Sequence, residues 1–252
     1  MKNEMLITDL DNSLLKNDKT ISEYTINIFE RCRNSGFVVV VATARPMVAA
    51  NEFINIIKPD GAIFNSGTIV MANGKLIAQQ GIDTTEVKQI VKKIEAKYPE
   101  ATISVVMNDV MYTNFDSPDM WFPYRKIEFN ELPNDKADKI ITGTISVEQI
   151  KTIDEYITQD LYLEIYDSRF GFIMNKNASK WLGVRELAKC FEIDIKNTIV
   201  FGDDMNDLTM LKNCGKGICM KNGLEEVKAI ADDICEDNEN DGIAKWIEKN
   251  VL

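Results

Sequence analysis

Short apolar runs alternate with amphipathic stretches through the first third of the chain. Residues 4–9 contain the apolar run Met-Leu-Ile, and residues 37–41 consist of one Phe and four Val. Continuous β-branched runs of this kind are typical of strands that are covered on both faces of a parallel sheet. Between the two runs, residues 20–23 match a capping box, and they predict a helix that begins at Thr20 and ends near Gly36.

The alternation continues with a helical pattern over 47–57 and a strand that begins at Ala62 and is broken at 65–67. Strand, helix, strand, helix, strand is the order of a doubly wound α/β core with a parallel sheet. The same pattern resumes late in the chain, where a helix over 181–190 precedes a buried strand over 198–202.

Between these two parts the pattern changes. A helix that Asp83 caps is followed by alternating strand patterns, an irregular stretch over 116–135 and a further helix between strands. We therefore expect an inserted α+β domain over 81–174, and a core domain made of residues 1–80 and 175–252. The strands expected in the insert are residues 103–107, 111–115, 139–145, 161–166 and 170–174.

Composition and charge narrow the choice of partners. The 252 residues are 45% hydrophobic and 27% charged, as in an ordinary globular protein. Twenty-nine basic and forty acidic residues give a formal charge of -11, which repels phosphate backbones and anionic membranes. We therefore expect neither nucleic acid nor a membrane as a partner, and a cytoplasmic location. The sequence leaves the oligomeric state open.

Cysteine and histidine usage limits the chemistry. The five cysteines are scattered and include no C-x-x-C pair, which is typical of reduced thiols, and the N-terminal residues have no signal-peptide pattern. The chain has no histidine, so Ser-His and Cys-His pairs are excluded and most zinc sites lack ligands. Carboxylates, Lys, Thr or Ser must act here, together with a hard metal ion.

Asp9 and Asp11 lie two residues apart where the first strand ends. Side chains at i and i+2 of an extended chain point to the same side, so both carboxylates can face one small volume. Such a pair can hold a divalent cation, or can provide a nucleophile with a proton donor. Because Asp is also a common turn residue, spacing alone leaves a simple turn as an equal alternative.

Three further loops follow core strands or the insert. Asp203, Asp204, Asn206 and Asp207 follow the strand over 198–202. Three acids and an amide within five residues call for a counter-cation such as Mg²⁺, although helix capping is the alternative. Thr43 offers an anion site near a helix start or else an N-cap, and Lys180 is either a functional residue or a solvated surface lysine.

The four loops resemble, in order and spacing, the motifs of the haloacid dehalogenase (HAD) superfamily of phosphotransferases. The insert resembles the α/β cap of the Cof-type, subclass IIB, sugar phosphatases. The matching segments are Asp9-Leu10-Asp11-Asn12-Ser13-Leu14, Thr43-Ala44-Arg45, Lys180 and Gly202-Asp203-Asp204-Met205-Asn206-Asp207, together with Lys221-Asn222-Gly223 and Asp241-Gly242-Ile243-Ala244 near the end.

The resemblance implies a role for each motif residue. Asp9 would be the nucleophile and Asp11 the general acid and base, while Asp207 would orient Lys180 or a metal-bound water molecule. Mg²⁺ would be held by Asp9, Asp203 and the backbone carbonyl of Asp11. The groups expected to contact the phosphoryl oxygens are the side chains of Lys180, Thr43 and Asn206 and the backbone amides of Leu10 and Ala44.

The chain departs from the family pattern at two places. Asn12-Ser13 stands where the family usually has Gly-Thr, and Ala44 stands where it has Gly. Candidate substrate contacts are Arg45, Arg125 and Trp121. Trp121 is alternatively part of the cap core, and Arg45 alternatively forms an ion pair with the cap.

The function implied is that of a Mg²⁺-dependent phosphatase. It would hydrolyse a phosphate monoester of a small metabolite, a sugar phosphate, through an aspartyl-phosphate intermediate, and the cap would close over the site. A phosphomutase of the phosphomannomutase type is one alternative. A non-catalytic regulator that binds a phosphorylated metabolite is another, because fold does not fix function.

Overall fold

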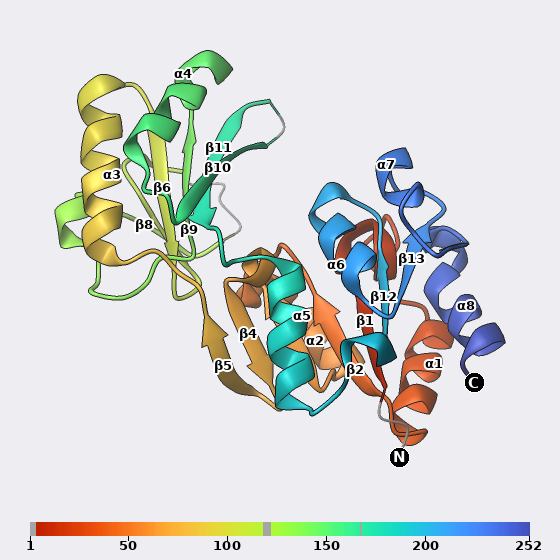
Figure 1. The fold of residues 1–252 in the computed structure, drawn as a ribbon. Helices are drawn as coiled ribbons and strands as arrows, with labels where there is room; N and C mark the ends of the chain where they lie inside the picture. The colour runs from red at the N-terminus through yellow and green to blue at the C-terminus, as the bar shows by residue number, and fades with distance from the viewer. Residues whose placement is uncertain (1–3, 118–121, 167) are drawn as a thin grey trace. The chain divides into compact units, whose positions relative to one another are not determined.

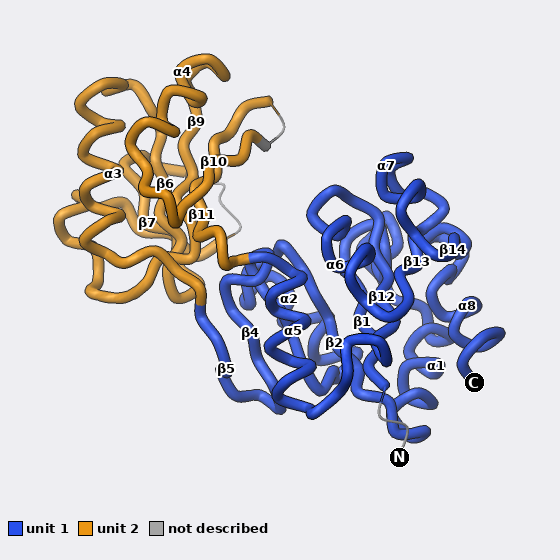
Figure 2. The backbone as a smooth tube through the Cα atoms, in the orientation of Figure 1, with its two compact units in different colours: residues 1–79, 179–252 blue, residues 80–178 orange. Residues whose placement is uncertain are grey.

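A computed structural model describes residues 4–117, 122–166 and 168–252, and these form two compact units. The first unit joins residues 1–79 to residues 179–252, and the second is residues 80–178 (Figure 2). The insert expected over 81–174 lies within the second unit.

The first unit contains an eight-stranded sheet in the order β14-β13-β12-β1-β2-β3-β4-β5 (Figure 1). Neighbouring strands from β14 to β3 are parallel, as a doubly wound fold requires, and this fold class is confirmed. The strands are β1 (Met5–Thr8), β2 (Val38–Ala42), β3 (Gly61–Phe64), β4 (Ile69–Ala72), β5 (Lys75–Gln79), β12 (Thr198–Gly202), β13 (Lys216–Met220) and β14 (Asp233–Cys235).

One edge of this sheet carries two strands, β4 and β5, that the hydrophobic pattern did not predict. Strands β4 and β5 pair antiparallel with β3 and with each other. They are joined at Asn73 and Gly74, whose φ angles of 49° and 72° suit a two-residue hairpin turn. The Asn-Gly pair was the sequence signal for this hairpin, and the analysis of hydrophobic patterns missed it.

Helices cover both faces of the sheet because alternate strand residues are apolar on both sides. Leu6 and Val39 pack into one core, beneath α1 (Glu23–Asn34), α2 (Met47–Ile57) and α8 (Gly242–Asn250). Met5 and Val40 pack into the other core, beneath α5 (Lys180–Cys190), α6 (Leu208–Asn213) and α7 (Glu225–Lys228).

The first helix begins later than the capping box at residues 20–23 predicts. Helix α1 starts at Glu23, and its N-cap is Ser22, whose hydroxyl accepts a hydrogen bond from the backbone N–H of Thr25 at 3.0 Å. Thr20 instead hydrogen-bonds to Asp18 through its hydroxyl and its N–H. The predicted start was therefore wrong, because the acceptor of Thr20 lies in the preceding loop.

The second unit is an α+β domain with a six-stranded sheet in the order β10-β11-β9-β6-β7-β8. All of its neighbouring strands are antiparallel except β7 and β8. Helices α3 (Thr84–Lys97) and α4 (Val147–Thr152) pack against this sheet. Its strands are β6 (Thr102–Met107), β7 (Val110–Thr113), β8 (Tyr124–Lys126), β9 (Lys139–Gly143), β10 (Leu161–Tyr166) and β11 (Phe170–Asn175).

The topology of the first unit determines where a site can form. Strand β1 lies between β12 and β2, so the chain order along the sheet reverses beside β1. Ligands of open α/β sheets bind at such reversal points, outside the carboxyl ends of the strands. Asp9, Thr43 and Asp203 directly follow β1, β2 and β12 at this edge.

All five cysteines are free thiols, as expected. Within the described ranges, no helix combines the length and the apolar character needed to cross a bilayer.

Candidate active site

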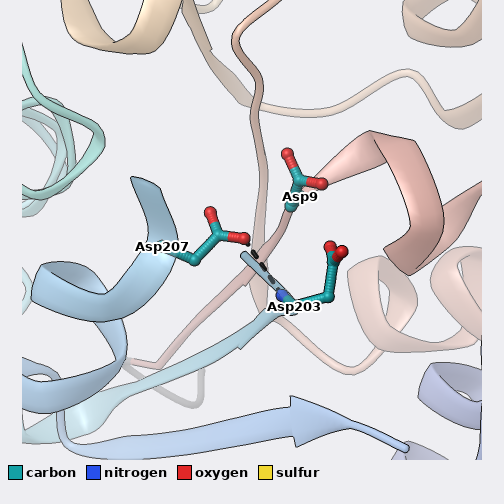
Figure 3. A group of neighbouring side chains, drawn as sticks. All are labelled: Asp9, Asp203 and Asp207. Carbon is teal, nitrogen blue, oxygen red and sulfur yellow. Dashed lines mark hydrogen bonds between the residues drawn. The ribbon is translucent and has the colours of Figure 1, made fainter. Parts of the chain in front are cut away.

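Three carboxylates meet at the carboxyl edge of the sheet. Asp9 follows β1, whereas Asp203 and Asp207 come from the loop and short helix after β12 (Figure 3). One oxygen atom of each residue can be chosen so that the three oxygens lie within 4.8 Å of one another, and all three side chains are buried. Two distant parts of the chain therefore produce one acidic cluster of Asp9, Asp203 and Asp207.

Lys180, the first residue of α5, supplies a positive charge to this acidic cluster. Its side chain is 1% exposed, and its Nζ donates hydrogen bonds to Asp9 Oδ1 at 2.7 Å and to Asp207 Oδ1 at 2.6 Å. A third bond goes to Asn206 Oδ1 at 3.0 Å. The alternative reading of Lys180 as a solvated surface lysine was wrong, since all three amine hydrogens have partners.

Asp207 is fixed from both sides. Its Oδ1 accepts the bond from Lys180, and its Oδ2 accepts bonds from the backbone N–H groups of Asp203 at 3.0 Å and Asp204 at 3.3 Å. The carboxylate therefore orients Lys180 through Oδ1 and, through Oδ2, completes the capping box of the short helix that begins at Met205, whose N-cap is Asp204. Asp207 thus makes the capping contact and the contact with Lys180 through different oxygens.

Burial and mutual repulsion determine the charge states. Burial raises the pKa of Asp9 well above its usual range; Lys180 opposes this shift, and the negative charges of Asp207 and Asp203 add to it. Burial likewise raises the pKa of Asp203 to about 6, against the hydrogen bond from Ser13. Burial lowers the pKa of Lys180, but the carboxylates of Asp207 and Asp9 outweigh burial and raise it. Lys180 is therefore a cation.

The acidic cluster thus lacks positive charge, because it has three buried carboxyl groups and one buried ammonium group, which bonds to Asp9 and Asp207. The hydrogen bonds of Asp9 and Asp203 among the described residues use Oδ1 in each case, which leaves Oδ2 of each for another ligand. A donor set made only of oxygens fits a hard cation such as Mg²⁺. The residues present therefore fit a divalent metal ion.

The structure shows what Asn12 and Ser13, which depart from the family pattern, contribute to the loop after Asp11. Asn12 adopts φ 57° and ψ 5°, a left-handed conformation that Asn tolerates better than most residues other than Gly. The next residue, Ser13, is buried, and its hydroxyl donates a 2.7 Å hydrogen bond to Asp203 Oδ1. The sequence shows that residue 13 retains a hydroxyl group, but it does not identify Asp203 as the hydrogen-bond partner of that group.

Asp11 is held by two cations. Arg45 Nε and Nη2 donate to its two carboxylate oxygens at 2.6 Å each, and Lys19 Nζ donates to Oδ1 at 2.8 Å. Burial alone would raise the pKa of Asp11, but the hydrogen bonds from Arg45 and Lys19 outweigh burial and lower it to about 2. Asp11 is therefore ionised at neutral pH. Lys19 was missed because one lysine in a polar loop has no sequence signal.

The remaining candidates are less closely grouped. Thr43 is buried, and its hydroxyl accepts a hydrogen bond from the backbone N–H of Arg45 at 3.0 Å, whereas Ala44 beside it is exposed. The N-cap of the following helix is Pro46, so Thr43 is not the cap. Arg125 lies exposed on β8 in the second unit, and Trp121 lies outside the described residues.

Comparisons with known proteins identify a family for the chain. A family model described as haloacid dehalogenase-like hydrolase matches residues 6–247. The 5-amino-6-(5-phospho-D-ribitylamino)uracil phosphatase of Bacillus subtilis is 27% identical over an alignment of 264 positions, which covers 97% of this chain and 96% of that protein. The phosphoglycolate phosphatase of Methanobrevibacter smithii is 21% identical over an alignment of 253 positions, which covers all of both chains.

Solved structures show the same fold. A haloacid dehalogenase-like hydrolase from Bacteroides thetaiotaomicron superimposes with a TM-score of 0.85 at 19% identity, and 98% of each chain is covered. The subclass IIB sugar phosphatase BT4131 gives a TM-score of 0.77 at 24% identity, with the same coverage. The prediction of a Cof-type phosphoric monoester hydrolase is confirmed at the level of family and enzyme class. The chain belongs to the haloacid dehalogenase-like hydrolases.

Proposed function

We propose that the chain is a Mg²⁺-dependent phosphatase that hydrolyses a phosphate monoester of a small metabolite, in the first instance a sugar phosphate. The observation that carries this proposal is the buried contact of Lys180 with Asp9 and Asp207 beside Asp203. Burying four charged side chains costs free energy, and folding alone gives no reason to place them at a ligand-binding edge.

In this proposal Asp9 and Asp203 hold Mg²⁺ with the backbone carbonyl of Asp11. When bound, the ion neutralises the repulsion between the nucleophile and the phosphate and stabilises the charge of the transition state. Lys180 orients Asp9 and, together with the added positive charge, keeps its carboxylate ionised against the effect of burial.

The reaction then takes two steps at Asp9. Its carboxylate attacks phosphorus, the P–O bond to the leaving group breaks, and an aspartyl-phosphate forms. Asp11 gives a proton to the leaving alkoxide, then accepts one from the water that cleaves the intermediate. Thr43, Asn206 and the amides of Leu10 and Ala44 donate to the phosphoryl oxygens. Lys180 joins them by exchanging its bond to Asn206 Oδ1 for one to a phosphoryl oxygen, while it keeps its bonds to Asp9 and Asp207.

The ion pair of Asp11 adds one requirement. A carboxylate that accepts three hydrogen bonds from Arg45 and Lys19 does not carry a proton at neutral pH. Asp11 must therefore exchange these partners before it can act as an acid, and an anionic substrate is the natural competitor for Arg45. The same pairing favours the base form that the second step uses.

The substrate class is supported by the relatives. One is named for a ribitylamino compound that carries a phosphate, and another for phosphoglycolate, so both act on small phosphorylated molecules. We propose that the second unit is a cap that selects the substrate, and that its Arg125 and Trp121 contact the substrate. Arg45 is a further candidate contact, from the first unit. A screen of phosphorylated metabolites that compares kcat/KM identifies the substrate.

Asp9→Asn tests the proposal directly. The variant should fold like the wild type, as judged by circular dichroism, and should not hydrolyse p-nitrophenyl phosphate, because the amide is not a nucleophile. Asp18→Asn, an exposed loop carboxylate that hydrogen-bonds to Thr20, is the matched control and should keep full activity. Appreciable hydrolysis by purified, folded Asp9→Asn would refute the assignment of the nucleophile.

Chelation tests the metal. EDTA should abolish hydrolysis and Mg²⁺ should restore it, whereas full activity in EDTA would contradict the metal site. A requirement for a sugar bisphosphate, with transfer of phosphate between positions instead of its release, would favour the phosphomutase alternative.

A further inference from the structure

The loop that joins β13 to α7 contacts both loops of the candidate metal site. Asn222 Nδ2 donates a 2.7 Å hydrogen bond to the backbone carbonyl of Asn12, on the loop that carries Asp9. Two residues later, the backbone N–H of Leu224 donates a 2.9 Å bond to the backbone carbonyl of Asp203. One short segment is thus tied to both sides of the site.

These contacts close a ring of hydrogen bonds. Asn12 is followed by Ser13, whose hydroxyl bonds to Asp203 Oδ1, and the carbonyl of Asp203 leads back through Leu224 to Asn222. The ring includes the left-handed turn at Asn12, which costs free energy and needs support. The bond from Asn222 to the Asn12 carbonyl fixes the peptide that precedes Ser13.

The middle residue of the segment allows the close approach. A Cβ atom at Gly223 would lie 2.7 Å from Cys219 Sγ and 3.0 Å from the Asp203 carbonyl oxygen. Only glycine therefore lets this backbone lie against the Asp203 loop.

A second asparagine, Asn238, supports Asn222. Asn222 Oδ1 accepts a 3.2 Å bond from the backbone N–H of Asn238, and the buried Asn238 side chain donates a 2.8 Å bond to the Leu15 carbonyl. The loop that carries Asp9 is thus held at two points, Asn12 and Leu15, from the C-terminal part of the chain.

We propose that Asn222 is a positioning residue that fixes the spacing of Asp9 and Asp203 and so raises the affinity of the site for its divalent cation. The inference rests on the proposed function, because it takes these two carboxylates as the ligands. Nothing requires Asn222 itself to contact the ion or the substrate.

The test is Mn²⁺ binding to the full chain, measured by isothermal titration calorimetry without substrate. Asn222→Ala should bind Mn²⁺ about fivefold to tenfold more weakly, as expected when a hydrogen bond that orients metal ligands is lost. Its thermal midpoint in EDTA should stay close to that of the wild type. If Asn222→Ala does not fold, Asn222→Leu, which keeps the branching of the side chain but cannot hydrogen-bond, should show the same loss of Mn²⁺ affinity.

Asn240→Ala is the matched control. Asn240 borders the same cavity of about 590 Å³ as Asn222, but its side chain bonds to Asp237 Oδ1 at 2.7 Å and to neither loop. It should bind Mn²⁺ like the wild type. Equal affinity of wild type and Asn222→Ala would overturn the inference while leaving the proposed function intact. No Mn²⁺ binding by the wild type would overturn both.

Discussion

Replacing Lys180 by Met should reveal how strongly the acidic cluster of Asp9, Asp203 and Asp207 depends on the buried ammonium group of Lys180. The substitution keeps an unbranched side chain and removes the charge from between Asp9 and Asp207, whose side chains are 8% and 0% exposed. Removing one partner of a buried ion pair typically costs about 3–5 kcal/mol. That is a large part of the roughly 5–15 kcal/mol that stabilises a domain.

At neutral pH we expect a cost near the lower end of the range of about 3–5 kcal/mol. Burial already raises the pKa of Asp9, so its carboxyl group can take up a proton when the ammonium group is removed. The cost should also depend on pH. A carboxyl whose folded-state pKa lies above its unfolded value destabilises the fold as pH rises from the unfolded to the folded value. Lys180→Met should therefore lose about 3 kcal/mol near pH 8 and less at pH 5.

Urea unfolding in EDTA measures this loss. Trp181 and Trp246 both lie in the first unit, so their fluorescence reports its unfolding. Lys189→Met, at the other end of α5, removes an exposed ion pair with Glu186 and should change the free energy by less than about 0.5 kcal/mol. Equal losses for the two variants, or a greater loss at pH 5 than at pH 8, would show that Lys180 does not compensate the buried carboxylates.

Three further outcomes follow from the geometry. Affinity for Mg²⁺ should fall about tenfold per pH unit below about 6, because protonated Asp203 is a poor ligand; equal titrations at pH 5 and pH 7 would contradict this. Arg45→Gln should raise the pKa of Asp11 from about 2 toward its usual value, which carboxyl carbon chemical shifts between pH 2 and 6 would report. Gly202→Ala places a Cβ atom 2.6 Å from Asp207 Cγ and should cost about 1–3 kcal/mol by chemical denaturation.

Sequence alone could place the acidic residues but not their neighbours. Asp9 and Asp203 each follow a buried strand, and parallel strands present their carboxyl ends at one edge, so their proximity follows from the fold class. Lys180 is 171 positions from Asp9, beyond an inserted domain, and no local pattern links the two. The resemblance to a family supplied that link, and burial of the ammonium group explains why the surface reading was wrong.

Pairings that depend on side-chain packing could not be predicted from the sequence. The bidentate contact of Arg45 with Asp11 joins the loops after β1 and β2, and either side chain could equally have been directed to solvent. The pKa of Asp11 depends on that pairing, so the requirement for partner exchange could not be derived from two carboxylates in a motif. Both residues of this ion pair belong to the first unit.

Asn12 and Ser13 show how a departure from a family pattern keeps the chemistry. A glycine at position 12 would adopt φ 57° without strain, whereas Asn adopts it at some cost. The bond from Asn222 to the Asn12 carbonyl compensates part of that cost, and it links the turn to the Asp203 loop. Ser13 needs only its hydroxyl to reach Asp203, and the methyl group of a threonine adds nothing to that bond. Asn12→Gly should therefore leave the fold intact, and Ser13→Ala should weaken metal binding, because only the second substitution breaks the ring that joins the two ligands.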